Sequence, residues 1–327
     1  MKACAPRLSL CIPTYNRAPF LEKTLQSIVG QALFQETNLV EVVVSDNCST
    51  DGTASTAAAF QNMFPEKVRC VRTEQLVHSS RNFARVLEAG RGTLRKLHND
   101  ALCIRDGFLD TCLRLTDNND ARKPLLFFLN GTIPCPDELT SCRDLDAFIG
   151  HVSFYTTWIG GFSIWSEDVP RYAEVFRHAP HHFAQTEILF SALAGGREAL
   201  VYNPKFGDEA VDVPKPITKH SLETIYFGEY LPLLREQAAQ GRITEKTAER
   251  EIYRFCFFYY IPYYHRISKR QFIKTFYKDF TFIKKYVNVI LYYVIHLYYI
   301  LLCFIYHYIK PHECKPSLRA VRRLLYR

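Results

Sequence analysis

The chain lacks the paired cysteine spacing of a zinc site or of a disulfide framework. Its 11 cysteines are scattered from Cys4 to Cys314, and no two stand in a CxxC pattern. We therefore expect reduced and mostly buried thiols. The chain also lacks a charged start followed by an apolar stretch and a small-residue cleavage site, because its first apolar run, residues 8–12, has only strand length. These absences favour a catalytic part that stays in the cytosol.

Internal repeats, low-complexity linkers and recognised nucleic-acid-binding modules are also missing. The net charge of +8 therefore favours acidic lipid headgroups or a pyrophosphate over nucleic acid as a partner. No glycine-rich turn with a lysine or arginine follows the first strand-like run, which disfavours a nucleotidyltransferase that grips a triphosphate. At 327 residues, the chain has the size of a single α/β catalytic domain with appendages.

Two apolar, β-branched runs each end in a polar turn. The run at residues 8–12 ends in Pro-Thr-Tyr-Asn-Arg, and the run at residues 40–45 ends in Asp-Asn-Cys-Ser-Thr-Asp-Gly-Thr. Both patterns are typical of buried strands whose carboxyl ends meet at one edge of an open α/β sheet, where ligands bind. Further along we expect strands at 68–72 and 93–97 and helices at 19–31, 53–64 and 80–89.

Asp46, directly after the second run, is the candidate ligand-binding carboxylate at this edge of the sheet. A carboxylate at a strand end can accept a hydrogen bond from a base N–H or a ribose hydroxyl, while Ser49 and Thr53 can cap the next helix. The alternative is that Asp46 and Asp51 only cap turns, since Asp-Asn and Asp-Gly pairs commonly do so.

The two turns together resemble family 2 glycosyltransferases with the GT-A fold, including bacterial enzymes that build O-antigen and capsule. The resemblance is strong over the first third of the chain and weaker to about residue 260. It implies an α/β fold, a GT-A type (Rossmann-like) mixed sheet flanked by helices, that binds a nucleotide-sugar donor, with a UDP-sugar favoured. The donor-binding residues that it implies are Pro13, Tyr15, Asn16, Arg17, Asp46, Asn47 and Asp51.

A third stretch, residues 96–101, stands where this family carries an Asp-x-Asp motif. In the family, a carboxylate of this motif binds a divalent cation, Mg²⁺ or Mn²⁺, which bridges the two phosphates of the nucleotide-sugar donor. Here His98 replaces the first Asp and Asp100 remains. The resemblance thus implies Asp100 as the metal ligand, with His98 able to assist because imidazole also binds Mn²⁺. The alternative is a metal-weak site that uses basic residues.

Inverting glycosyl transfer needs a base that takes a proton from the acceptor hydroxyl. Glu187 is the candidate, because a polar Gln-Thr-Glu interrupts an apolar helical pattern and resembles the acidic base segment of the family, where Asp is more frequent. Glu167 and Asp168 are weaker rivals, since they look like a helix cap. Trp158 and Gly160 are candidate acceptor contacts, because aromatic rings stack on sugars and glycine allows close approach; core packing is the alternative.

The C-terminal region changes character. Residues 268–285 predict a basic amphipathic helix, and residues 287–306 form an uncharged, tyrosine-rich run that is long enough to span a bilayer. We favour a helix embedded in the membrane interface over a spanning one; a buried docking helix is the alternative. The expected parts are a nucleotide-sugar-binding half (1–130), an acceptor-binding half (131–265) and a helical membrane-associating extension (266–327).

Together these features predict an inverting glycosyltransferase of cell-surface polysaccharide biosynthesis. It would transfer a sugar to a lipid-linked saccharide at the cytoplasmic face of the bacterial inner membrane. The missing first Asp supports an alternative, a non-catalytic nucleotide-sugar-binding or scaffold protein.

Overall fold

The computed structural model describes residues 5–178, 182–210 and 225–256, together with residues 286, 288, 290, 293 and 297. The described chain divides into two compact units. The first contains residues 1–148 and 155–219, and the second contains residues 149–154 and 220–327. The predicted extension from residue 266 lies almost entirely outside the described residues. Within the part that is described, none of the helices combines the length and the apolarity needed to cross a bilayer.

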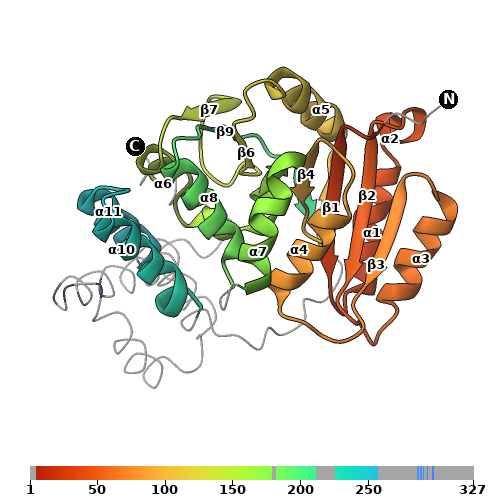
Figure 1. Ribbon diagram of the computed structural model, residues 1–327, viewed down its shortest axis with the longest axis horizontal. Helices are drawn as coiled ribbons and strands as arrows, with labels where there is room; N and C mark the ends of the chain where they lie inside the picture. Colours follow the sequence, from red (N-terminus) through yellow and green to blue (C-terminus); the bar gives the residue numbers. More distant parts are fainter. Residues whose placement is uncertain are drawn as a thin grey trace, which may run out of the picture. The chain divides into compact units, whose positions relative to one another are not determined.

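A five-stranded sheet in the order β3-β2-β1-β4-β8 forms the centre of the first unit. Figure 1 shows its strands β4, β1, β2 and β3 side by side. All pairs are parallel except the last, in which β8 runs antiparallel to β4. The strands are β1 (Leu8–Thr14), β2 (Val40–Asp46), β3 (Val68–Arg72), β4 (Leu94–Leu97) and β8 (Ser163–Trp165).

Every residue of β1 and β2 is buried, which is typical of central parallel strands covered on both faces. The apolar stripe of α1 packs Leu21, Leu25 and Ile28 into the core. The helix α4 contacts β1 and β2 and also packs against α7. The helices that follow the first strands are α1 (Ala18–Val29), α2 (Ala32–Glu36), α3 (Thr53–Met63) and α4 (Ser79–Ala89).

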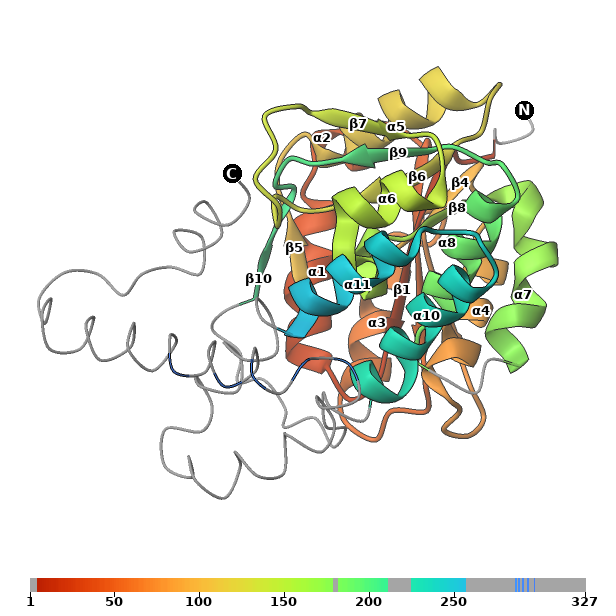
Figure 2. The same cartoon turned by 90° about the vertical axis from the view of Figure 1, so that its left-hand side faces the viewer.

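The second part of this unit adds two small sheets, β6-β9-β7 and β10-β5. Figure 2 shows β7, β9 and β6 as neighbours. The strands are β5 (Leu102–Ile104), β6 (Leu125–Phe128), β7 (Leu139–Cys142), β9 (Ala199–Tyr202) and β10 (Gly207–Glu209). The helices and 3₁₀ turns are α5 (Phe108–Asn119), η2 (Ile159–Gly161), η3 (Ser166–Asp168), α7 (Val169–His178) and α8 (Ala184–Ala194). Two further elements, α6 (Leu145–Val152) and η1 (Ser153–Thr157), contain residues of both units.

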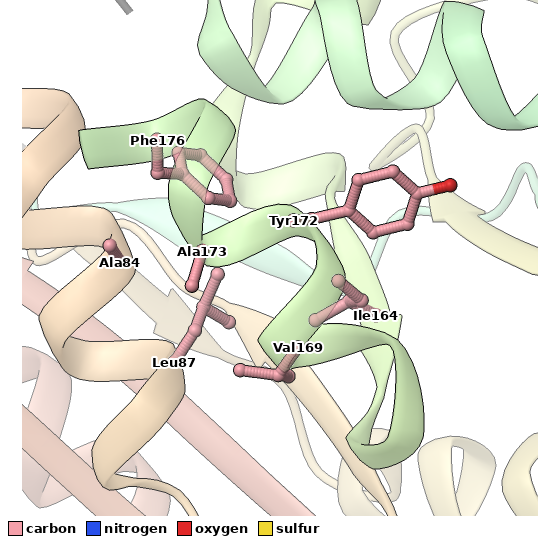
Figure 3. A pocket seen from close by; sticks show the side chains of 7 residues that line it. All are labelled: Ala84, Leu87, Ile164, Val169, Tyr172, Ala173 and Phe176. Carbon is pink, nitrogen blue, oxygen red and sulfur yellow. The ribbon is translucent and has the colours of Figure 1, made fainter. Parts of the chain in front are cut away.

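The interface between α4 and α7 is apolar. Ala84 and Leu87 of α4 face Val169, Ala173 and Phe176 of α7 around a small pocket (Figure 3). These side chains are almost fully buried. Because the side chains around the pocket are all apolar, this part of the interface contributes hydrophobic stability rather than a ligand site. An ion pair between Glu88 of α4 and Arg177 of α7 lies at its exposed edge.

The second unit contains a π-helical turn η4 (Tyr226–Tyr230), α10 (Leu231–Ala239) and α11 (Glu245–Arg254). Its core is aromatic: the rings of Tyr226 and Phe255 stack with centroids 4.7 Å apart, and Phe154 meets Phe255 edge-on at 5.8 Å. Stacked and edge-on rings of this kind stabilise a small core beyond their buried area.

Candidate functional site

The turns after β1 and β2 are joined by hydrogen bonds at the carboxyl edge of the sheet. Asn16 adopts a left-handed φ of 51°, its N–H donates to Ser49 Oγ at 2.8 Å, and its Oδ1 accepts from Thr50 N–H at 2.8 Å. Asparagine tolerates this conformation better than most residues. The side chain of Asn16 therefore fixes the two predicted turns against each other.

Arg17 and Asp51 continue this connection. The N–H of Arg17 donates to Thr53 Oγ1 at 2.9 Å, and Asp51 accepts from the N–H groups of Ala18 and Thr53. Asp51 thus lies against the first residues of both α1 and α3, where a negative charge is favourable. These contacts match the turn-capping alternative for Asp51 and leave the guanidinium of Arg17 at the mouth of the site.

Asp46 lies at the end of β2 and is 3% exposed. Its Oδ1 accepts from Ser49 N–H at 3.1 Å, and its Oδ2 lies 3.2 Å from Nη1 of Arg72. Among the described residues, this buried Oδ2 accepts no hydrogen bond. The charge of Arg72 stabilises this carboxylate, and Oδ2 keeps lone pairs that can accept a hydrogen bond from a ligand.

The neighbours of Asp46 differ in what they offer to a ligand. The side-chain amide of Asn47 is engaged with the backbone of Val77, donating to its carbonyl at 2.8 Å and accepting its N–H at 3.0 Å. Pro13 is buried in β1 opposite Ser45. Tyr15, by contrast, is 42% exposed. Of these three residues, Tyr15 has the side chain that is most available to a base or a sugar.

Asp100 follows β4 and meets the end of β1. Its Oδ2 accepts from Thr14 Oγ1 at 2.8 Å, and its Oδ1 lies 3.8 Å from Nη1 of Arg17. Burial raises the pKa of Asp100 to about 6, although Arg17 and Thr14 oppose this shift. Thr14 also pairs with Asp46 in the β1–β2 register. The two candidate carboxylates therefore flank the same strand end.

His98 is fully buried. Its Nε2 lies 2.8 Å from the carbonyl of Leu102, so this nitrogen carries the proton, and its Nδ1 is buried with no hydrogen-bond partner among the described residues. Burial, and then the charge of Lys96, lower the pKa of His98 to about 3. The imidazole is neutral and holds the turn after β4, while its free nitrogen has no exposed surface.

A divalent cation would find one acidic ligand here. No group of three or more His, Cys, Asp and Glu side chains that could hold a metal ion occurs in the part of the chain that the structure describes. A magnesium-type ion nevertheless binds through one or two carboxylates, water and substrate phosphates, which fits Asp100.

The acceptor candidates lie in the turn before β8. Trp158 is half-buried and Gly160 is buried, and a Cβ on Gly160 would lie 2.5 Å from Cζ2 of Trp158. Glycine at this position therefore lets the indole ring pack over the backbone. The contact matches the core-packing alternative for Gly160 and leaves part of the Trp158 ring accessible.

Glu187 lies in the first turn of α8 and is half-buried between fully buried neighbours. Gln185 donates to the carbonyl of Thr157 at 2.8 Å, and Thr186 donates to that of Thr156 at 3.0 Å. These bonds fix the start of α8, with Glu187, to the segment that leads into Trp158. The rival carboxylates form ion pairs, Glu167 with Lys123 and Asp168 with Arg197.

Sequence reasoning missed Thr14, Arg72 and Lys96. Arg72 ends β3 and pairs with Asp46 in the β2–β3 register, so its place at the end of a predicted strand was a usable signal. Lys96 was also visible as a lysine inside an apolar strand. The contact between Thr14 and Asp100 joins residues far apart in the chain and had no local signal.

Comparison with known proteins shows similarity to glycosyltransferases. Residues 9–107 match Glycosyl transferase family 2. Abequosyltransferase RfbV of Salmonella typhimurium is 34% identical over 112 residues, which cover 32% of this chain and 33% of that protein. Validoxylamine A glucosyltransferase of Streptomyces hygroscopicus subsp. jinggangensis is 40% identical over 80 residues, or 24% of this chain and 18% of that protein. The chain thus matches a third or less of the length of these relatives.

Solved structures show the same fold at low identity. S. aureus TarS is 13% identical in its 1–349 fragment, solved in complex with UDP-GlcNAc, with a TM-score of 0.53 over 81% of this chain and 74% of that one. A second TarS structure gives 0.52 at 14% identity over 76% of this chain and 43% of that one. The family match confirms the predicted resemblance to family 2 glycosyltransferases over residues 9–107. The fold is mixed α/β with a mainly parallel sheet, consistent with the predicted GT-A type.

Proposed function

We propose that this chain is an inverting glycosyltransferase that moves a sugar from a nucleotide donor to a saccharide acceptor. The observation that carries the proposal is the pair of buried carboxylates, Asp46 and Asp100, on either side of Thr14 at the carboxyl edge of the sheet. Two arginines, Arg17 and Arg72, lie beside these carboxylates. Acceptors for a nucleoside and cations for a diphosphate thus occur together, which suits a nucleoside diphosphate sugar.

Donor binding would use the two sides of this edge differently. The Oδ2 of Asp46, which accepts no hydrogen bond among the described residues, suits a base N–H or a ribose hydroxyl, and Tyr15, in the turn after β1, offers an exposed ring. Arg17 can pair with the phosphates, since a guanidinium matches phosphate geometry. The UDP-GlcNAc in the TarS structure supports a UDP-sugar as the first donor to test.

The metal would be Mg²⁺ or Mn²⁺, held by Asp100 as its acidic protein ligand. When bound, such an ion neutralises charge that develops on the departing nucleoside diphosphate. Arg17 lies 3.8 Å from Asp100, so its guanidinium is within reach of phosphates whose cation Asp100 would hold. His98 then acts by holding the turn that carries Asp100, rather than as a ligand.

Glu187 is the proposed general base. It accepts the proton of the acceptor hydroxyl while that oxygen attacks the anomeric carbon from the face opposite the leaving phosphate. The bonds of Gln185 and Thr186 to residues 156–157 keep this carboxylate near the Trp158 turn. Trp158 would stack on the acceptor sugar.

The acceptor is proposed to be a lipid-linked saccharide of O-antigen or capsule synthesis at the cytoplasmic face of the bacterial inner membrane. The abequosyltransferase relative supports a sugar-transfer role. The net charge of +8 and the basic, tyrosine-rich sequence after residue 266 support contact with an anionic membrane.

A panel of UDP-, dTDP-, GDP- and CDP-sugars tests the proposal. We expect one nucleotide class to raise the melting temperature of the full chain, and Asp46→Ala to abolish that shift. Donor turnover with Mn²⁺ then separates an enzyme from the non-catalytic scaffold suggested by the histidine at position 98. If a donor binds and neither hydrolysis nor transfer occurs, the scaffold alternative holds.

A further inference from the structure

Lys96 is a fully buried lysine in the central sheet, and the mechanism proposed above does not use it. Its Nζ donates to the carbonyl of Gly160 at 2.6 Å and to that of Leu97 at 3.1 Å. Three aromatic rings surround the ammonium group, with their centroids at 4.8 to 5.7 Å; they belong to Phe128, Phe206 and Phe108.

A charge at this position carries a cost that an apolar residue would avoid. Removing an ammonium group from water is unfavourable by several kcal/mol unless hydrogen bonds and charge partners compensate. Among the residues that the structure describes, no carboxylate is paired with Lys96; carbonyl oxygens and ring faces supply the compensation. The hydrogen bond that stabilises the Lys96 ammonium group also fixes its acceptor, the carbonyl of Gly160, in place.

The carbonyl it fixes belongs to the turn that carries Trp158. The indole ring packs over the backbone of Gly160 and lies 6.0 Å from the ring of Phe206, which is part of the same aromatic cage. Backbone bonds also support the arrangement: Leu97 N–H donates to Phe162 O at 3.0 Å, and β8 pairs with β4 from Ser163 onward. Lys96 thus closes the connection between β4 and the Trp158 turn.

The other end of this connection leads to the donor site. The strand that contains Lys96 continues through His98, whose N–H donates to Cys11 of β1 at 2.8 Å, and then to Asp100. A shift of the Trp158 turn relative to β4 would change the distance between the acceptor-side ring and the carboxylate that faces the diphosphate.

We propose that Lys96 is a positioning residue that holds the Trp158–Gly160 turn at a fixed place relative to Asp100, and so sets the acceptor platform against the donor. The claim that this turn binds the acceptor rests on the proposed function. The claim that Lys96 holds the turn in place, the mechanical part, does not. Loss of the ammonium group loosens the turn at Gly160, although Gln185, Thr186 and the β4–β8 pairing still hold its two ends. It leaves the Asp46 side of the donor site unchanged.

Tryptophan fluorescence tests the mechanical part directly, because the chain contains 2 tryptophans and Trp165 is 1% exposed. Collisional quenching by acrylamide therefore reports mainly on Trp158. In the full-length Lys96→Met variant we expect the quenching constant of the accessible tryptophan to rise about two-fold, while the melting-temperature shift caused by UDP with Mn²⁺ stays at the wild-type value.

Lys67→Met is the matched control. Lys67 also donates to two carbonyls, those of Phe34 and Gln35, and also lies over an aromatic ring, that of Phe34. It lacks any bond to the Trp158 turn, so its loss should leave the quenching unchanged. Equal quenching in wild type and folded Lys96→Met would overturn the inference, as would an equal rise in both variants.

Time-resolved fluorescence anisotropy of the unmodified protein gives a second test that does not depend on the folding of any variant. A fixed turn predicts no large sub-nanosecond component for Trp158, and a large component would refute the positioning role. If the tryptophan results agree with the inference and no nucleotide binds, the proposed function fails while the positioning role stands.

Discussion

The Asp100→Asn substitution should stabilise the protein while removing its metal response. Asparagine has the shape of the carboxylate and keeps an oxygen that can accept from Thr14 Oγ1. Asparagine carries no charge, so it avoids the cost of burying a charged group. That cost raises the pKa of Asp100 from 3.8 to about 6. The variant therefore separates the stability cost of this carboxylate from its use.

The pKa shift gives the size and the pH range of the effect. A shift of roughly two units corresponds to about 3 kcal/mol, taken as an upper bound. Because the pKa is higher in the folded state, the ionised carboxylate destabilises the fold, with its full effect above pH 6 and none below pH 3.8. Asp100→Asn should thus gain up to about 3 kcal/mol at pH 7.5 and nothing near pH 4.

Urea unfolding of both proteins in EDTA, between pH 4 and pH 8, measures this difference. Asp208→Asn is a control of opposite sign, since Arg105 and then Lys205 lower the pKa of that exposed carboxyl to about 2. It should lose stability at neutral pH. With UDP and Mn²⁺ present, wild type should gain stability and Asp100→Asn should gain much less.

Two results would refute this reasoning. A variant that is less stable than wild type at pH 7.5 without metal would mean that Arg17 and Thr14 outweigh the burial of Asp100. Retention of full Mn²⁺-stimulated donor turnover by the variant would remove Asp100 from the metal site.

Three other substitutions or deletions test the remaining parts. Asp46→Ala should raise the Kd for UDP about 10- to 100-fold in calorimetry, as expected for one charged hydrogen bond, whereas Asp117→Ala, at an exposed ion pair, should not; equal affinities would exclude Asp46. His98→Ala should lower the melting temperature by leaving the Leu102 carbonyl unpaired, yet keep Mn²⁺ stimulation; loss of stimulation in the folded variant would make His98 a ligand. Deletion of residues 268–327 should release the protein from anionic liposomes without changing UDP affinity, and high salt should detach the full chain only partly; a full-length chain that ignores such liposomes would favour the docking-helix alternative.

Local sequence patterns predicted the donor half of the fold well. The expected strands at 8–12, 40–45, 68–72 and 93–97 correspond to β1, β2, β3 and β4, and the expected helices correspond to α1, α3 and α4. These elements follow one another along the chain, and each has its own apolar period and its own polar turn. The turns after β1 and β2 lie together, as predicted, because the carboxyl ends of neighbouring parallel strands meet at one edge of the sheet.

The roles within the site were harder to predict because they depend on partners distant in sequence. Asp51 and Asn47 read as donor ligands, yet their oxygens meet backbone N–H groups of Thr53 and Val77. The burial of His98 depends on how residues 98–102 fold back, and residue types alone do not reveal it. The strand β8, which completes the sheet beside β4, has just three residues and carries little periodic signal.

The order of strands in the sheet also has a consequence for how the chain folds during synthesis. Strands β1 to β4 lie within the first hundred residues and pair in parallel, so all four are synthesised well before β8. Until β8 is made, β4 is an open edge, and open edges of apolar strands tend to pair with other chains. The inward-facing ammonium group of Lys96 makes such pairing unfavourable, because an aggregate would have to bury it without the Gly160 carbonyl. The lysine is therefore favourable at this position only once the turn before β8 is in place, which disfavours pairing of β4 with any other strand.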